Sequence, residues 1–520
     1  MTAPAQLPRR VEVLAGLSVA IDLGLGQPAE HMLRSAVVAC RLADRLGLSQ
    51  QQKATVYYTT LLMWIGCHAD SQEYARWFGD DIAVRRDAYL VDWSGVPYLR
   101  FLLGNVARGE PLGQRVRVMT ALMRDARGQL GTLIHSHCTS AGALARHIGV
   151  GAEVEHALAF TFERFDGAGL PTGASGSELP IEMRVAQLAD VAEVHHRMYG
   201  VDGAIAMARS RRGGHFDPDV VDAFTTDTEN LFPAADEDPW GAAFEIAPDS
   251  EVRLDDARLD ELLTAIGDFV DLKCPFALGH SRNVAALAAA AAVQLGLPPN
   301  DVTDVRRAGH VHHVGRMGVS NQVWSKGSAL SGAEWERVRM HPYFTDRVLT
   351  RIPGLARVAA IARAHHEHID GSGYPLGLAG AALGRPERLL AAAVAYQSAL
   401  EPRPYREALT PEEAAARLSE RVRSGVLDPS SVDAVLAVVG HPATRRRRED
   451  TLSPRETEIL GLVARGLSNR EIASRLVLSE KTVRNHVERT YAKIGATNRV
   501  GASLYALEHG LVTPGAGAEQ

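Results

Sequence analysis

The chain has 520 residues, yet it has few cysteines and no long apolar run. Its four cysteines have no CxxC spacing, which gives no indication of a disulfide framework: Cys40, Cys67, Cys138 and Cys274. The longest apolar stretch, near 285–297, is too short and too interrupted to span a bilayer. A signal peptide and a nucleotide-binding Walker loop are also missing. We therefore expect a soluble cytoplasmic protein without membrane contact, and no ATP-driven mechanism.

Residues 452–511 carry the signals of four short helices. Ser453, followed by proline and then by Glu456, forms a capping box with proline at the first helical position. Ser468 and Glu471 repeat this pattern, and Ser479 opens a third helix that is rich in exposed hydrogen-bond donors. Two short helices joined by a tight turn suit the major groove of DNA.

This segment resembles the LuxR/FixJ-type helix-turn-helix domain through the runs S-P-R-E, G-L-S-N-R-E-I-A, S-x-K-T-V-R-N-H-V and K-I-G-x-x-N-R. The resemblance implies double-stranded DNA as a partner and a dimerising helix at 499–510. It implies five DNA-facing side chains and two that lie near phosphates: Lys481, Thr482, Asn485, His486 and Arg489, with Arg470 and Lys493. The alternative is a small helical bundle with a solvated charged face.

The charge distribution also points to DNA contact at this end of the chain. Residues 445–513 contain thirteen Lys and Arg against eight Asp and Glu, although the whole chain has a net charge of −6. A basic segment on an acidic body suits phosphate neutralisation by that segment alone. Arg445–Arg448 form either a phosphate-contacting linker or a plain solvated one.

The rest of the chain contains two copies of one module. Residues 162–176, FERFDGAGLPTGASG, align without a gap with 366–380, HEHIDGSGYPLGLAG. His137 precedes Thr161 by 24 residues, as His341 precedes His365. An internal duplication of a helical module explains these matches.

We therefore expect an all-α protein with two HD-domain-like helical modules and a four-helix LuxR-type domain. The expected segments are copy one at 1–225 with an insertion at about 70–130, an acidic linker at 226–255, copy two at 256–440, a basic linker at 441–450, the DNA-binding domain at 451–513 and a tail at 514–520.

Copy two resembles the HD-GYP family, which are helical phosphohydrolases. The motifs that carry the resemblance are DLKCPFALGHSRNVA, AGHVHHVGRMG, RMHP, HHEHIDGSGYP and RPYREAL. The resemblance implies cyclic di-GMP as substrate and two or three metal ions bridged by a carboxylate. It places six histidines at or beside the ligand positions: His280, His312, His313, His341, His365 and His366.

Copy two departs from the family pattern at the acidic ligands. The bridging aspartate is replaced by His313, a later aspartate by Val394, and the family's lysine by Arg316. Two dications without a shared anionic ligand repel, so the cluster fits one divalent transition metal, namely zinc, iron, manganese or nickel. Alternatively, the histidines are a fossil site whose side chains form hydrogen bonds within the core.

Copy one has lost most of the motif. Its ligand positions hold His31, Met63, Trp64, His137, Thr161, Phe162 and Asp190, so we expect no catalysis there. Cys67, His68 and Asp70 form one cluster of possible metal ligands, and His135, His137 and Cys138 form another. We interpret them as unrelated side chains, because the clusters are far apart in the sequence and their spacing fits no known metal site.

The D-G-x-G loops allow two interpretations. If copy two is active, Arg316 and Asp370 take part in catalysis; otherwise Asp370 and its counterpart Asp166 are turn caps. Arg388 and Arg184, which follow these loops, contact phosphate or pair with the loop aspartate.

These observations predict a homodimeric, DNA-binding transcriptional regulator whose body senses a metal, a cyclic dinucleotide or another small ligand. The first alternative is a metal-dependent phosphodiesterase of cyclic di-GMP or a related compound that also binds DNA. The second alternative is a body that serves only for oligomerisation or protein contact.

Overall fold

The computed structural model describes residues 7–108, 111–441, 452–494, 496, 498–508 and 511. These residues form helices and short 3-10 turns with only isolated β-bridges, which confirms the all-α expectation. The chain divides into two compact units, Met1–His441 and Pro442–Gln520. The arginine run at 445–448, the predicted linker beyond His441 and the predicted tail lie outside the described residues. Among the described helices, none combines the length and apolarity needed to cross a bilayer.

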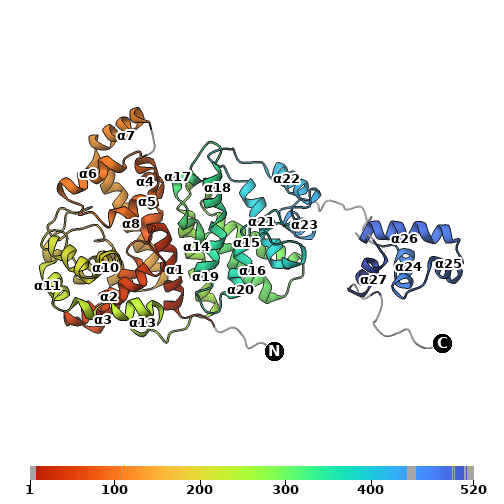
Figure 1. The fold of residues 1–520 in the computed structure, drawn as a ribbon, viewed down its shortest axis with the longest axis horizontal. Coiled ribbons are helices and arrows are strands. Elements are labelled where there is room, and N and C mark those ends of the chain that lie inside the picture. The colour runs from red at the N-terminus through yellow and green to blue at the C-terminus, as the bar shows by residue number, and fades with distance from the viewer. Residues whose placement is uncertain are drawn as a thin grey trace. The chain divides into compact units, whose positions relative to one another are not determined.

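The first module forms one half of the first unit (Figure 1). In its core, α2 packs against both α3 and α10. The helices of this module outside the insertion are α1 (Arg10–Leu25), α2 (His31–Arg45), α3 (Gln50–Leu62), α8 (Ala126–Ile148), α9 (Ala152–Leu158), η2 (Gly176–Glu178), α10 (Ile181–Ser210) and α11 (Pro218–Thr226).

The insertion is helical. It contains η1 (Ile65–His68), α4 (Ser71–Phe78), α5 (Asp81–Ala88), α6 (Gly95–Asn105) and α7 (Leu112–Arg124). Helices α6 and α7 project at one end of the unit (Figure 1), while α4 and α5 lie beside the second module.

The segment 226–255 is not the linker that its composition predicts. It forms η3 (Thr228–Asn230), α12 (Pro233–Glu237) and α13 (Pro239–Glu245). Helices α12 and α13 pack on α2, and Leu231, Phe232 and Ala243 are buried in the main core. The acidic and proline residues that suggested a linker act here as helix starts, since Asp238 accepts a hydrogen bond from the Gly241 amide and both helices begin with proline.

The second module repeats the arrangement of the first, with α15 packed against α16 and α21. Its elements are α14 (Asp256–Asp271), η4 (Pro275–Ala277), α15 (His280–Gln294), α16 (Pro299–Val311), η5 (Val314–Gly318), α17 (Asn321–Trp324), α18 (Gly332–Arg339), α19 (His341–Leu349), α20 (Ala356–Arg363), η6 (Gly380–Ala382), α21 (Arg385–Ala399), α22 (Pro411–Arg423) and α23 (Pro429–Val438).

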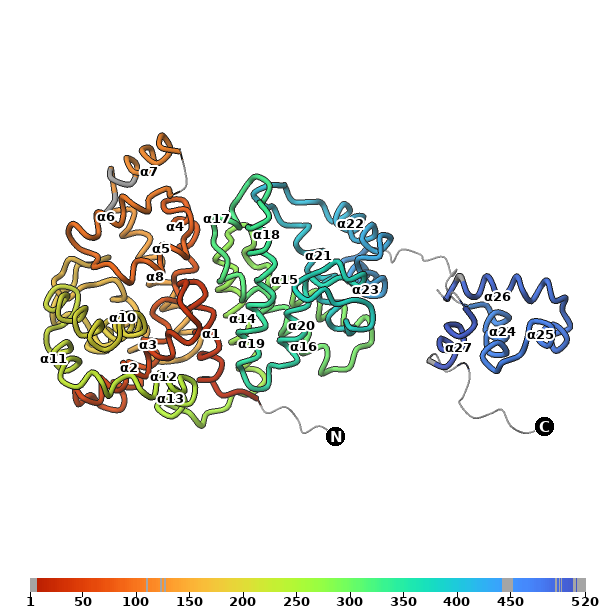
Figure 2. Tube along the Cα trace, in the orientation of Figure 1, coloured from red at the N-terminus to blue at the C-terminus, as the bar shows by residue number. Residues whose placement is uncertain are grey.

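The two modules share a single hydrophobic core rather than a thin interface. Helix α1 runs along the seam and packs against η5 and α19 of the second module (Figure 2). Gly16 allows this close approach, because a Cβ atom there would collide with the side chain of Ile352. Asp81 and Lys273 also meet across the seam, 3.7 Å apart.

The second unit has the four predicted helices, α24 (Pro454–Ala464), α25 (Asn469–Leu476), α26 (Glu480–Ile494) and α27 (Arg499–Glu508). The predicted capping boxes are present, because Ser453 and Ser468 accept hydrogen bonds from the amides of Glu456 and Glu471. Ile459, Ile472 and Val483 form part of its own small core.

Candidate functional site

Six histidines from four parts of the second module converge in its interior. His280 begins α15, His312 and His313 follow α16, His341 begins α19, and His365 and His366 follow α20: all six sequence-predicted positions lie in one cluster. His280, His312 and His313 form one group with ring nitrogens close enough to share a metal ion, and His313, His341 and His365 form another. His366 stacks on Tyr374, with ring centroids 4.8 Å apart.

Hydrogen bonds orient four of these rings in the same way. The Nδ1 atoms of His312, His341 and His365 donate to backbone carbonyls three residues earlier, at 2.6–2.7 Å. The Nδ1 atom of His280 donates to Glu401 at 2.8 Å. With the proton on Nδ1, each ring directs the lone pair of Nε2 into the cluster, which is how metal-ligating histidines are held.

The Nε2 atoms then face one another in pairs. Those of His280 and His312 are 3.3 Å apart, and those of His341 and His365 are 3.0 Å apart. Facing lone pairs at these distances repel unless a cation lies between them, and two nitrogens on a tetrahedral zinc ion are roughly 3.4 Å apart. The donor set therefore fits a divalent metal ion.

His313, at the position of the missing aspartate, has no hydrogen-bond partner at either ring nitrogen, although its side chain is buried. Burial, together with the Arg316 guanidinium and the neighbouring histidines, lowers the pKa of His313 well below 6.5. A buried neutral imidazole without a partner is costly in a folded protein unless it has a ligand to bind. His313 is thus a candidate ligand that belongs to both groups of histidines.

Above the cluster is a cavity of about 710 Å³ lined by cations and aromatic rings. Among the described residues that line it, none is Asp or Glu. Six carry positive charge: Arg316, Lys326, Arg403, Arg406, Arg417 and Arg421. Five are aromatic: Phe276, Trp324, Trp335, Tyr374 and Tyr405. Such a lining suits a ligand that has both anionic and flat apolar groups.

Arg316 lies within this cavity, as expected for a residue at the lysine position, whereas Asp370 does not line it. The Asp370 carboxylate instead accepts hydrogen bonds from the amide and hydroxyl of Ser372. Its counterpart Asp166 accepts from the Ala168 amide. The interpretation of both aspartates as turn caps is therefore confirmed.

The arginines that follow the two loops occupy equivalent places. Arg184 pairs with Asp217, and Arg388 approaches Asp428 at 3.5 Å. Asp217 caps the start of α11, and Asp428 caps the start of α23. The two arginines therefore do not pair with the loop aspartates, and neither lines the cavity. The matched pairs are further support for the duplication.

Sequence reasoning missed two carboxylates that organise the site. Glu401 lies two residues beyond the end of α21, the helix that carries Val394, and its carboxylate reaches His280 from there. The buried Glu367 accepts hydrogen bonds from the amides of Leu376 and Leu378 and so holds the D-G-x-G loop. Its place in the H-H-E motif was a usable signal, whereas Glu401 had no motif to mark it.

The corresponding site of the first module is filled by protein. The Nε2 atom of His31, which would face a metal, instead contacts Asp190 at 3.0 Å, and its Nδ1 contacts Glu193 at 2.5 Å. Although burial opposes the charge, these two carboxylates raise the pKa of His31 to about 10. Trp64 and Phe162 occupy the centre, with their rings 5.4 Å apart.

The structure brings Asp70 and His137 together, so the interpretation of these two as unrelated side chains was wrong, whereas the His68 imidazole binds the Ile65 carbonyl. Arg85 donates to the Cys67 carbonyl and to Asp70, at 2.9 and 2.6 Å, and Asp70 lies 3.5 Å from His137. These residues form a buried network on the side of the first module that faces the second. Spacing in the sequence did not indicate it because η1, the residue before α4, α5 and α8 supply its members.

The predicted DNA-facing residues lie mostly on the exposed side of α26. Lys481, Asn485 and Arg489 are exposed and spaced four residues apart, which places them on one face of the helix. His486 is half-buried, Thr482 shares a hydrogen bond with Ser479, and Arg470 is exposed on α25. Lys493 pairs with Glu456 at 2.7 Å.

Comparisons with known proteins match both parts of the chain. The family model described as "HD domain" matches residues 123–220 and 265–431, about half of the chain. The model described as "Bacterial regulatory proteins, luxR family" matches residues 450–506.

Similar individual proteins are known for both units. The 3'3'-cGAMP-specific phosphodiesterase 3 of Vibrio cholerae serotype O1 is 29% identical over 423 residues, which are 80% of this chain and 92% of that one. A crystal structure of a cyclic GMP-AMP specific phosphodiesterase from V. cholerae superimposes with a TM-score of 0.57 and 25% identity, covering 84% of this chain and 98% of that one. The DNA-binding transcriptional activator DevR/DosR of Mycobacterium tuberculosis is 37% identical over 95 residues, 18% of this chain and 44% of that protein.

Proposed function

Because the chain belongs to the HD-domain family and ends in a luxR-family domain, we propose that it is a transcriptional regulator that binds a cyclic dinucleotide in its second HD module. The ligand would be 3'3'-cyclic GMP-AMP or cyclic di-GMP, and the C-terminal unit would bind DNA as part of a homodimer. A dimer would present two recognition helices to half-sites about one helical turn apart.

The observation that carries the proposal is the charge of the cavity. Among the described residues around this space of about 710 Å³, six side chains are cationic and none is a carboxylate. A cyclic dinucleotide carries two phosphodiesters and two purine bases, which suit arginine side chains and aromatic rings respectively. The similarity to phosphodiesterases of cyclic dinucleotides supports the same ligand class.

The histidine cluster would hold the metal ion. His280, His312, His341 and His365 offer oriented Nε2 lone pairs, and His313 offers either nitrogen. A cluster of neutral nitrogen ligands favours zinc, nickel or ferrous iron over ions that prefer oxygen. A bound dication would add positive charge at the floor of the cavity, where a phosphate group of the ligand is expected.

A phosphodiesterase is the second candidate, favoured by the similarity over 92% of the Vibrio enzyme and by the retained histidines. The donor set argues against efficient turnover. No acidic residue belongs to either group of potential ligands among the described residues. Glu401 is already bound to the Nδ1 of His280 rather than directed between two ions. Hydrolysis in this family requires bridged metal ions, which this set does not provide.

Titration calorimetry of the purified protein with 3'3'-cyclic GMP-AMP and cyclic di-GMP tests the proposal. We expect binding that is weakened at least about tenfold in Arg421→Ala, because a charge-assisted contact to phosphate contributes more than 1 kcal/mol. Arg282→Ala, on an exposed face of α15, is the matched control and should bind normally. Absence of binding by the wild type would contradict the proposed ligand.

Incubation with the same dinucleotides and manganese or iron separates the two candidates. We expect little linear product from the wild type. Turnover that disappears in His366→Ala would establish the phosphodiesterase instead.

Light scattering of the full chain, alone and with DNA, tests the proposed homodimer. A monomer bound to DNA would exclude the dimer.

A further inference from the structure

We propose that Asp81 of the first module is a positioning residue for Arg316 in the cavity of the second. The inference deepens the proposed function and rests on it, since it assigns the first module a role in shaping the ligand site. It depends on a continuous series of contacts that crosses the seam between the modules, from Asp81 through α17 to Trp324 and Arg316.

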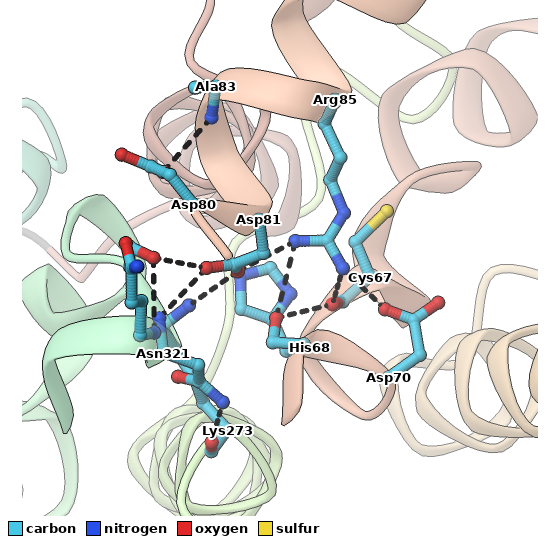
Figure 3. Close-up of polar contacts among 12 residues, drawn as sticks. Cys67, His68, Asp70, Asp80, Asp81, Ala83, Arg85, Lys273 and Asn321 are labelled. Carbon is cyan, nitrogen blue, oxygen red and sulfur yellow. Dashed lines mark hydrogen bonds and ion pairs between the residues drawn. The ribbon is translucent and has the colours of Figure 1, made fainter. Parts of the chain in front are cut away.

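Asp81 holds the start of α17 from the opposite module (Figure 3). Its fully buried carboxylate accepts hydrogen bonds from the Ser320 hydroxyl at 2.6 Å and the Asn321 amide at 2.8 Å. The other carboxylate oxygen pairs with Arg85 at 3.0 Å and lies 3.7 Å from the Lys273 ammonium. Both oxygens are therefore engaged: one binds the second module alone, and the other lies between Arg85 of the first module and Lys273 of the second.

The first module fixes Asp81 in turn. Arg85 binds Asp81, Asp70 and the carbonyl of Cys67, so its guanidinium ties α5 to the start of α4. Asp70 also lies 3.5 Å from His137, the counterpart of the second module's His341. A histidine at a former ligand position has thus become part of the support for this seam.

At its other end α17 supplies a wall of the cavity. Trp324, one turn after Asn321, has its ring 4.9 Å from the Arg316 guanidinium carbon and 5.6 Å from the His341 ring. An arginine above an indole face at this distance makes a cation–π contact. A shift of the start of α17 therefore moves the ring against which Arg316 rests.

Arg316 depends on that ring to an unusual degree. Its side chain is buried, and in the part of the chain that the structure describes its guanidinium makes no ion pair or hydrogen bond. Arg403 and Arg421 of the cavity, by contrast, have polar partners, namely Glu401 and His368. Among the cavity cations, Arg316 is the one whose orientation follows from Trp324, and so from Asp81.

The test uses full-length protein labelled with 5-fluorotryptophan, studied by ¹⁹F NMR without any ligand. Trp324→Phe identifies the Trp324 resonance. In Asp81→Asn this resonance should shift or broaden, because the weakened acceptor no longer fixes Ser320 and Asn321. Ser320→Ala leaves all charges in place but removes both the bond to Asp81 and the cap that Ser320 gives to the Gln322 amide, so it should also change the resonance. Asp87→Asn, on the same helix but paired only with Arg86, should produce none.

The second measurement is the dissociation constant for 3'3'-cyclic GMP-AMP. We expect it to rise about tenfold in Asp81→Asn, the size that loss of a partly desolvated cation–π contact implies. In a Trp324→Ala background the Asp81→Asn change should add nothing, because the two changes act through the same contact. Additive effects would overturn the proposed route.

The NMR measurement tests the positioning role, and the binding measurement also tests the proposed ligand, so the two proposals can be contradicted separately. An unchanged Trp324 resonance in Asp81→Asn and Ser320→Ala overturns the positioning role, whatever the wild type binds. If Asp81→Asn does not fold, Asp81→Glu, which keeps the charge but displaces the carboxylate, takes its place. A resonance that responds in a protein that binds no dinucleotide supports the positioning role and refutes the proposed ligand.

Discussion

At position 313 an imidazole stands where the resemblance to HD-GYP proteins implies a carboxylate. The change removes a negative charge and a bridging oxygen but keeps a nitrogen donor. Because burial and Arg316 keep this ring neutral, the cluster presents no anion to compensate two dications. One residue therefore decides between a site for one borderline metal ion and a bridged pair.

Restoring the lost acids should change the metal chemistry. We expect His313→Asp combined with Val394→Asp to raise the metal content per chain, and to favour manganese or iron over zinc, since carboxylates suit harder ions. Hydrolysis of cyclic di-GMP should rise by about tenfold or more over the wild type.

Elemental analysis and product chromatography measure these changes. Val394→Asn, equal in size but uncharged, is the matched control. A double variant with unchanged metal content would contradict the charge argument.

His31 in the first module predicts a pH dependence of stability. Its pKa is raised to about 10 by Glu193 and Asp190 despite burial, against about 6.5 in the unfolded chain. The folded protein thus holds this proton more tightly, so the contribution of His31 is complete below pH 6.5 and is lost as the pH rises towards 10. It should be on the order of 3–5 kcal/mol.

Urea unfolding of metal-free protein between pH 7.5 and 9.5 measures the effect. The wild type should lose stability across this range. His31→Gln, which cannot be charged, should be less stable at pH 7.5 and should change less with pH. Parallel slopes for the two proteins would show that His31 is not protonated in the folded state.

The six histidines show how far single residues can be predicted. Family spacing identified each of them, and all six lie in one cluster. Glu401 and the network around Arg85 could not be foreseen, because their partners come from helices distant in the sequence. Resemblance locates positions within a motif, whereas contacts between helices depend on packing that no motif records.

Among the elements, α26 carries the clearest functional prediction. Lys481, Asn485 and Arg489 form an exposed stripe, while Val483 and Val487 anchor the opposite side in the core. Lys481→Ala with Arg489→Ala should reduce affinity for operator DNA at least about thirtyfold, since two charged contacts contribute about 1–3 kcal/mol each. The unfolding temperature should hardly change, because both side chains are exposed.

Fluorescence anisotropy with operator DNA measures the loss. Arg212→Ala with Arg282→Ala, which removes the same charge from exposed sites on the first unit, is the control. Sequence-specific binding that persists in the α26 variant would contradict the assignment of this helix.

The first residues of helices could be predicted from the sequence more reliably than segments without helices. Ser453 and Ser468 cap helices as their sequence pattern predicts, because a capping box is a local interaction. The same local chemistry misled at 226–255, where aspartates and prolines that resemble a linker begin two short helices. Only the burial of Phe232 and Ala243 against the main core distinguishes the two cases, and burial is not local.

For the whole molecule, the tandem body was predictable and its seam was not. The duplication is visible in the sequence, but the contacts across the seam come from α1, α8 and the insertion, and the insertion has no sequence counterpart in the second module. The composition at 226–255 suggested a boundary between two separate bodies, whereas this segment and both modules contribute to one shared core.

Regulation by ligand must be reciprocal if the two units communicate. We expect 3'3'-cyclic GMP-AMP to change the affinity of the full chain for operator DNA, and DNA to change the affinity for the dinucleotide by the same factor. Calorimetric titration with the dinucleotide, with and without saturating DNA, measures this factor for the dinucleotide, and the same factor applies to DNA. Equal dinucleotide affinities in the two titrations would show that the body does not control DNA binding through this ligand.

Because His31 pairs with Asp190, the two modules should respond differently to removal of metal ions. In the first module a protonated imidazole already provides the positive charge that the second would draw from a metal ion. A chelator should therefore destabilise only the second module. Amide hydrogen exchange should become faster in α15 and α19, while α2 and α10 stay protected. The half with the built-in cation would act as a fixed reference against which the metal-dependent half changes.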